Sequence, residues 1–250
     1  MKNNLLLIIC LIVLTSCTKA QDKTVVIEYS NETNGYKIKS TWIPKIVSSN
    51  HVIGPAIIEL YNIADSTTYT VTNNNFSILK SNLPFTYSKD SLEIKSLNKN
   101  LLNLEYKSSK INNSESFGTT DVPFFFADID FDNVKELLIA EVGNGQRGIA
   151  TFRAYQINEG SGLESKKFLS MPFIDFDEMT EIDYEGENII LYGSGGLCYN
   201  SYSIFSKKRN FNLDILIKQE RNDNLNKCYQ YTYKIINGRE VLISKEEKQI

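Results

Sequence analysis

Histidine is nearly absent from this 250-residue sequence, which contains one. That residue, His51, lies in a polar stretch, so neither a Ser-His-Asp triad nor a histidine-based zinc site is expected. The Gly-Ser-Gly-Gly run at 193–196 lacks the lysine of a phosphate-binding loop and the spacing of a hydrolase nucleophile turn, which favours a flexible turn. We therefore expect a protein that is not an enzyme. A glycan hydrolase that acts through paired carboxylates stays open as an alternative, because acidic residues are numerous.

Long hydrophobic runs are also missing. The apolar run 5–14 has ten residues, whereas a membrane-spanning helix needs about 20. Placed after Lys2, it has the length of the apolar segment of a secretion signal. No second long apolar run follows, so the rest of the chain is expected to be soluble apart from any attached lipid.

The tetrapeptide that ends this run, Leu14-Thr15-Ser16-Cys17, resembles the lipobox of bacterial lipoproteins. The resemblance implies a signal peptide over 1–16, a diacylglyceryl thioether on Cys17 and a fatty acid such as palmitate on its amine. An ordinary secretory signal with a chance cysteine is the alternative. Residues 17–23 are polar and predict a short tether. Because no acidic run follows Cys17, we expect a lipid anchor in the cell envelope, on the periplasmic side of the outer membrane.

Positive charge is in deficit, with 27 basic against 30 acidic residues and a formal net charge of −3. No basic stripe is present, so nucleic acid is not an expected partner. The expected partners are the membrane, through the lipid, and a protein or glycan of the envelope.

Cysteine is scarce as well, and two cysteines remain after the signal and the lipidation site, Cys198 and Cys228. In an oxidising compartment we expect them to form a disulfide. Closing that loop of about 30 residues would stabilise the fold by ~3–4 kcal/mol in the chain-entropy model. Two separate buried thiols are the alternative.

Helical periodicity is weak throughout, while short runs of aromatic and β-branched residues are broken by Asn, Gly, Ser and Asp. This pattern predicts an all-β protein of antiparallel meanders, either β-propeller-like or made of two packed β units. The polar stretch 107–116 predicts a linker between an N-terminal β region (24–106) and a C-terminal β region (117–250). Asn237-Gly238 predicts a tight hairpin turn, because both central positions of a type I′ turn need positive φ. The expected strands are 24–29, 36–42, 55–61, 68–72, 92–94, 122–127, 137–142, 150–157, 189–192, 199–205, 212–218, 229–236 and 240–244.

Carboxylates gather in one loop of the second region, at loop positions 1, 3, 5 and 9. They are Asp128, Asp130, Asp132 and Glu136. Placing so many carboxylates together is costly unless a cation neutralises them, and Ca²⁺ prefers oxygen ligands. The Val134 carbonyl at position 7 would supply a further oxygen.

The loop differs from an EF-hand, because position 12 holds Ile139 instead of a glutamate and both flanks are strand-like. Asn133, at position 6, tolerates the left-handed backbone that this position needs. We therefore predict a β-hairpin stapled by calcium in a structural role. A solvated turn is the alternative.

The spacing Phe117-Gly118, then Asp128-x-Asp130-x-Asp132-x-x-x-Glu136-Leu137, resembles the FG-GAP/VCBS calcium loop of integrin-type β-propellers. One copy is present, so a full seven-bladed ring is not expected. Residues 122–246 also resemble a group of small bacterial secreted or lipidated proteins, some of which are periplasmic lysozyme inhibitors. This resemblance implies a lipid-anchored binding protein, an inhibitor or immunity protein against cell-wall lytic enzymes. A purely structural lipoprotein is the alternative.

Two further segments are weaker candidates. A Gly-rich loop with Gln146 and Arg147 at its centre is a possible partner-binding loop on the rigid hairpin. A second acidic cluster is more consistent with a solvated loop than with a metal site, since it lacks a third alternating acid; its members are Asp175, Asp177, Glu178, Glu181 and Asp183.

Overall fold

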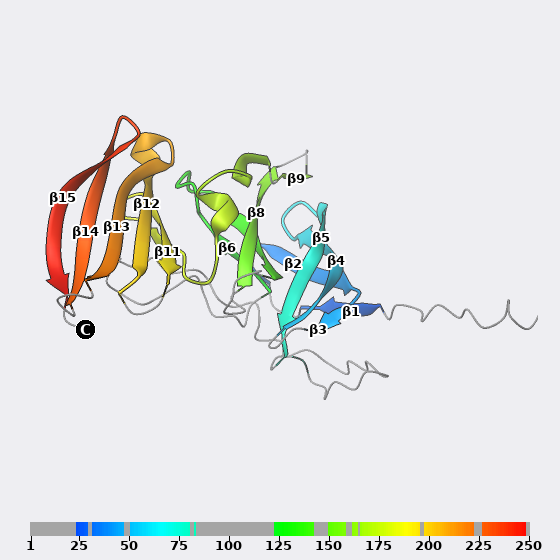
Figure 1. Ribbon diagram of the computed structural model, residues 1–250. Helices are drawn as coiled ribbons and strands as arrows, with labels where there is room; N and C mark the ends of the chain where they lie inside the picture. The colour runs from blue at the N-terminus through cyan, green and yellow to red at the C-terminus, as the bar shows by residue number, and fades with distance from the viewer. Residues whose placement is uncertain are drawn as a thin grey trace, which may run out of the picture.

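The computed structural model describes residues 24–29, 32–47, 51–80, 83, 123–142, 150–158, 162–164, 166–195, 198–222 and 227–248. It confirms the all-β prediction, because these residues form a nine-stranded and a six-stranded antiparallel sheet joined by short 3₁₀ turns (Figure 1). None of the helical segments in these ranges has the length and apolarity that crossing a membrane requires.

The first sheet follows a path of seven strands, with two more strands paired beside it. The path is β1 (Val25–Glu28), β2 (Tyr36–Trp42), β4 (His51–Asn62), β5 (Thr68–Leu79), β7 (Glu136–Val142), β8 (Ala150–Asn158) and β9 (Gly162–Glu164), while β3 (Ile46–Val47) pairs with β4 and β6 (Phe124–Ala127) with β7. β5 meets β7 at Phe76 and Glu141, and the Asn73 amide donates to Glu141 Oε1 at 3.2 Å. Strands from both expected β regions thus belong to one sheet.

The second sheet is a simple meander in sequence order. Its strands are β10 (Glu181–Asp183), β11 (Asn188–Ser194), β12 (Asn200–Ser206), β13 (Asn212–Asn222), β14 (Lys227–Ile236) and β15 (Arg239–Lys248). Asn237 and Gly238 join the last two with φ of 52° and 75°, which confirms the predicted hairpin turn.

The strands β6, β7 and β8 have apolar side chains on both faces, and each face lines a separate core. Phe124 and Leu137 pack with residues of β1–β5 in the first core, whereas Phe125 and Leu138 pack with residues of β10–β12 in the second core. Figure 1 shows β6 and β8 between these two groups of strands. Burial on both sides explains why β6 (FFFA) and residues 137–140 of β7 (LLIA) are unbroken apolar runs instead of alternating ones.

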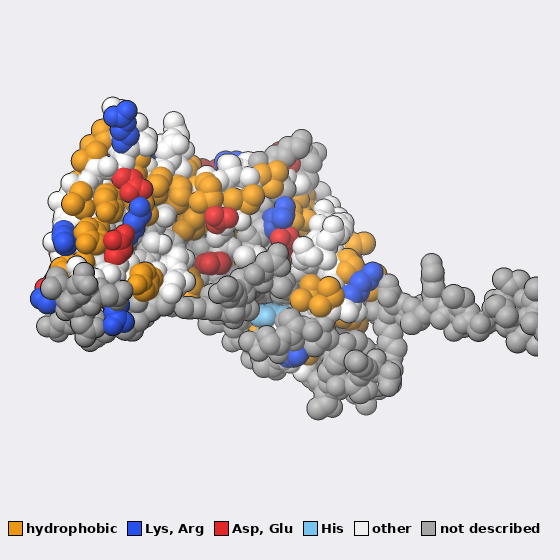
Figure 2. All heavy atoms as spheres, in the orientation of Figure 1, with side chains coloured by type: hydrophobic (Ala, Val, Ile, Leu, Met, Phe, Trp, Pro, Cys, Tyr) orange, Lys and Arg blue, Asp and Glu red, His pale blue; other side chains and the backbone are white. Residues whose placement is uncertain are grey.

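The end of the second sheet is more open than its beginning. β13 and β14 are mostly half-buried along their length, and β15 is mostly exposed. Figure 2 shows hydrophobic side chains, with acidic and basic ones among them, over these strands on the face in view. Val241, Leu242 and Ile243 are among the exposed apolar residues.

Most predicted strands are confirmed, with β4, β5, β13 and β15 clearly longer than expected. The short strands β3, β9 and β10 were not predicted. The predicted strand 92–94 and the linker 107–116 lie outside the described residues.

Candidate metal centre

The acidic loop, residues 128–135, connects β6 to β7 and is anchored by its own apolar residues. Ile129 and Phe131 are buried in the second core. The Phe131 ring stacks on Phe211, with centroids 6.2 Å apart, and meets the Tyr184 ring edge-on at 5.9 Å. These contacts hold the loop against the second sheet without using any of its carboxylates.

The backbone of the loop turns back on itself through two left-handed residues. Phe131 has φ of 60° and Asn133 has φ of 68°, so the expected left-handed geometry at Asn133 is confirmed. Asp128 accepts hydrogen bonds from the backbone N–H groups of Asp132 (3.1 Å) and Asn133 (3.0 Å). The loop shape is thus fixed partly by a residue that was predicted as a ligand.

Three of the predicted ligands come together. One carboxylate oxygen from each of Asp128, Asp130 and Glu136 lies within 4.8 Å of the other two. The site is deep, because Asp130 is 4% exposed and Glu136 is fully buried. Glu136 Oε2 accepts from the Ile129 N–H at 3.0 Å, while Glu136 Oε1 and Asp130 Oδ1 have no hydrogen-bond partner among the described residues.

Such buried oxygens are unfavourable as free charges, and the pKa values reflect this. The pKa of Glu136 is raised to about 8, chiefly by burial; the Ile129 hydrogen bond opposes this shift, and the charges of Asp130, Asp132 and Asp128 add to it. Burial also raises the pKa of Asp128, although its two backbone hydrogen bonds oppose the shift. A divalent cation would supply the positive charge that these carboxylates lack.

The other two predicted ligands lie at the margin of this group. Asp132 is half-exposed, and its Oδ1 accepts from the Val134 N–H at 2.8 Å, so it is not among the three converging carboxylates. Val134 has an exposed side chain. The oxygen-only donor set fits a hard cation such as Ca²⁺ better than zinc, which prefers nitrogen and sulfur.

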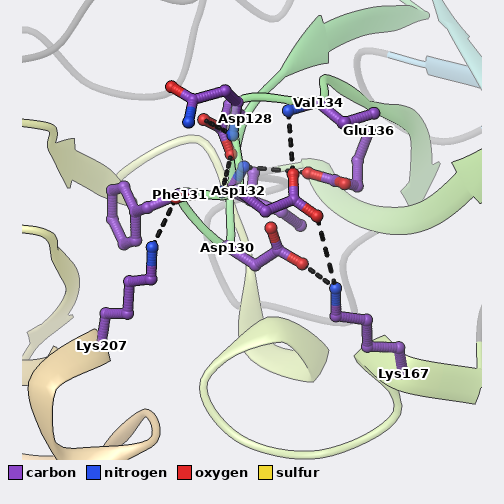
Figure 3. Close-up of polar contacts among 10 residues, drawn as sticks. Asp128, Asp130, Phe131, Asp132, Val134, Glu136, Lys167 and Lys207 are labelled. Atoms are coloured by element: carbon purple, nitrogen blue, oxygen red, sulfur yellow. Dashed lines mark hydrogen bonds and ion pairs between the residues drawn. The ribbon is translucent and has the colours of Figure 1, made fainter.

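Two lysines reach the loop from distant segments, as Figure 3 shows. Lys167, on the short turn η3 (Lys166–Phe168), forms an ion pair with Asp130 and lies 4.0 Å from Asp132 Oδ2. Lys207, on η5 (Lys207–Arg209), donates to the Phe131 carbonyl at 2.5 Å across 76 residues of sequence. Sequence reasoning missed both, because no local spacing links them to the loop.

The environment of Lys167 favours its charged form. Burial lowers the pKa of this ammonium group, but the hydrogen bond and the charge of Asp130 outweigh it, so the pKa lies above its usual value. The net effect is that a positive charge already sits beside Asp130.

The second acidic cluster has a structural explanation. Asp177 accepts from the Met179 N–H at 2.8 Å, and Asp183 accepts from the Gly186 N–H at 3.0 Å and from the Asn188 amide. These carboxylates shape turns before and after β10. Among the described residues they do not form a close group of the kind found in the acidic loop.

The two cysteines are brought together, and the structure has them as free, buried thiols. Burial, and then the neighbouring Cys198 thiol, raise the pKa of Cys228 to about 11. The disulfide is therefore not observed and stays a prediction. The lipidation site Cys17, the signal and tether, and the loop with Gln146 and Arg147 all lie outside the described residues.

His51 is not in a polar loop as expected, because it begins β4 and is buried, and burial lowers its pKa. It belongs to the first sheet, where it pairs with Leu79 of β5, and it is not among the residues that converge in the acidic loop.

No protein-family model matches the chain, and no curated protein matches its sequence. Among solved structures, the chain is similar to one described as the structure of a Xanthomonas type IV secretion system related protein. The TM-score is 0.57 at 12% identity, and the likeness covers 88% of this chain and 93% of that one. At this identity the likeness supports the all-β fold alone. The resemblance of the loop to FG-GAP/VCBS repeats stays a prediction.

Proposed function

We propose that this chain is a lipid-anchored binding protein of the bacterial cell envelope whose fold is stabilised by one bound calcium ion. More specifically, we propose that it is an inhibitor or immunity protein against cell-wall lytic enzymes. The observation that carries the proposal is the convergence of Asp128, Asp130 and Glu136, with buried carboxylate oxygens that lack hydrogen-bond partners.

A calcium ion suits this loop on chemical grounds. Ca²⁺ takes six to eight oxygen ligands in flexible geometry, and Asp128, Asp130 and Glu136 would hold it, with Asp132 at the margin. Glu136 begins β7 and Asp128 directly follows β6, so the ion would tie the two strands that line both cores. Its role is therefore structural.

The depth of the site favours an ion over a sugar substrate. A glycoside hydrolase needs its two carboxyl groups on either side of the scissile bond, in contact with the substrate. Asp130 and Glu136 are buried, so a glycan has no access to them. This argues against the alternative of a hydrolase for this particular group of acids.

The inhibitor role is supported by the resemblance of residues 122–246 to lipidated and secreted bacterial proteins. The proposed anchor at Cys17 would keep the protein where lytic enzymes reach the cell wall.

The anchor has a direct test. Cells that express the chain with a clickable palmitate analogue should label the wild type and place it in the membrane fraction. Cys17→Ser should lose both the label and the membrane association. A labelled Cys17→Ser variant would contradict the lipidation site.

The inhibitor role is tested by the release of soluble fragments from peptidoglycan by purified muramidases, with and without the full chain. We expect stoichiometric inhibition of at least one muramidase, lost in Asp130→Asn and kept in Asp175→Asn, an exposed aspartate outside the loop. The absence of inhibition across the panel would contradict the inhibitor role. Fragment release by the chain alone, abolished by one Asp or Glu substitution, would support the hydrolase instead.

A further inference from the structure

The acidic loop has a cation within the chain itself. The Lys167 ammonium contacts Asp130, one of the three converging carboxylates, and is close to Asp132 (Figure 3). Asp130 is almost fully buried, whereas the Lys167 side chain is 44% exposed. The lysine thus reaches inward from the surface to a carboxylate that solvent does not reach.

We propose that Lys167 is a tethered competitor for the cation site, so that binding calcium requires the ammonium group to leave Asp130. This inference rests on the calcium site proposed above, and it assigns to Lys167 the role of lowering the affinity of that site for calcium. Two cations close together on the same buried carboxylate repel each other strongly, because the effective dielectric constant there is low. Occupation of Asp130 by Lys167 and by calcium is therefore mutually exclusive.

The anchoring of η3 allows this exchange without a change in the fold. Phe168, the next residue, is buried in the second core with its ring centroid 5.1 Å from that of Phe173. The backbone at Lys167 is thus held in place, while its long side chain already lies partly in solvent. Rotation of that side chain is enough to move the ammonium group from Asp130 to water.

The competition has a measurable consequence. If the ammonium group occupies Asp130 in about 90% of calcium-free molecules, the apparent Kd for calcium is about tenfold above the intrinsic one. Lys167→Met removes the charge, keeps an unbranched side chain and should recover that factor.

Lys207 provides a matched control. It is also a half-exposed lysine beside the loop, but its ammonium group bonds to the Phe131 carbonyl and lies 3.4 Å from Glu187 instead of contacting the ligands. Lys207→Met therefore removes the same charge from the same neighbourhood without vacating Asp130.

The test is a calorimetric titration of calcium into the full chain in detergent, for the wild type, Lys167→Met and Lys207→Met. We expect calcium to bind Lys167→Met about tenfold more tightly than the wild type, and Lys207→Met within about threefold of it. Equal affinity of the wild type and Lys167→Met, or equal tightening by both substitutions, would overturn the competition while leaving the calcium site intact. If Lys167→Met binds calcium and neither the wild type nor Lys207→Met does, the result supports the competition. If no variant binds, the calcium site itself is refuted and the competition with it.

A second readout follows the lysine directly. Calcium should increase the rate at which an amine-reactive reagent labels Lys167, measured by mass spectrometry, while labelling of Lys207 stays constant. By linkage, the gain should approach the factor found in the titration. An unchanged labelling rate at saturating calcium would overturn the exchange.

Discussion

Glu136 has two roles at the buried end of the loop, and two substitutions separate them. Its Oε2 accepts the hydrogen bond from the buried Ile129 N–H, and its carboxylate is one of the three that would bind the proposed cation. Only the first role matters when calcium is removed.

We expect Glu136→Ala to destabilise the fold in chelator by ~1–3 kcal/mol, because the Ile129 N–H is left buried without an acceptor. Glu136→Gln keeps a carbonyl acceptor and should stay within about 1 kcal/mol of the wild type. Urea denaturation with excess chelator gives both values. Equal losses in the two variants would show that the Ile129 bond is unimportant.

At this scale the sequence predicted part of the site. The spacing of the acidic residues predicted that Asp128, Asp130 and Glu136 converge. The tolerance of asparagine for a left-handed backbone predicted the turn at Asn133. It did not predict Phe131 as a second left-handed residue, since phenylalanine has no preference for that conformation. Asp132 was also predicted as a ligand, but its carboxylate accepts a hydrogen bond from the Val134 N–H and is not among the three that converge.

Among the elements, β13, β14 and η5 are joined by one carboxylate. Asp214 lies 2.7 Å from both Arg209 Nη1 and Lys234 Nζ, and Arg209 also donates to the Ile235 carbonyl. Burial alone would raise the pKa of Asp214, but the bonds from Lys234 and Arg209 outweigh it and hold the pKa below its usual value.

The lowered pKa of Asp214 determines how its contribution to the free energy of unfolding changes with pH. A carboxyl group with a lowered pKa in the folded state stabilises the fold above its unfolded pKa of about 3.9, and the contribution is lost as pH falls through the folded value. Asp214→Asn should therefore be less stable than the wild type at pH 6, and the gap should narrow below about pH 4. Chemical denaturation across this range measures it, and a gap independent of pH would contradict the assignment.

A disulfide between the two cysteines would link the segment before β12 to β14, which lie two strands apart in the second sheet. If the protein is exported, we expect the pair to be oxidised. Thiol titration of the denatured, unreduced chain from the periplasm should then find neither Cys198 nor Cys228 reactive, whereas cytoplasmic expression should leave both reactive. Two reactive thiols in the periplasmic sample would contradict the predicted disulfide.

Strand boundaries were predictable where the pattern was local. The Asn-Gly pairs at 34–35 and 237–238 have positive φ throughout, as their turns require. β10 was missed because three residues beside several acids give no clear alternation. β4 begins earlier than the expected strand 55–61, because it continues back through Gly54 to His51, although glycine usually weakens a strand.

In the whole molecule, β6–β8 are shared by two cores, so substitutions on either face should be costly. Phe124 and Phe125 point to opposite sides and both are buried. We expect Phe124→Ala and Phe125→Ala each to lose ~3–5 kcal/mol of unfolding free energy. Thermal or urea unfolding provides the measurement, and Val241→Ala, at an exposed position of β15, is the control. A small loss from only one phenylalanine would indicate a sheet covered on one side.

The sequence did not predict the pairing of β5 with β7. Contacts between strands so far apart in sequence depend on which faces fit together, and hydrophobic periodicity describes each strand separately. The same limitation applies to Lys167 and Lys207, which are far from the loop in sequence and contact it only in the folded chain.

The most direct test of the central claim is the difference in melting temperature between excess calcium and excess chelator. We expect the wild-type chain to melt higher in calcium, with up to ~2.7 kcal/mol of added stability at 100 times Kd. Asp130→Asn should lose this difference, and Asp175→Asn should retain it. A wild-type melting temperature that is the same in calcium and in chelator would contradict the calcium-stapled hairpin.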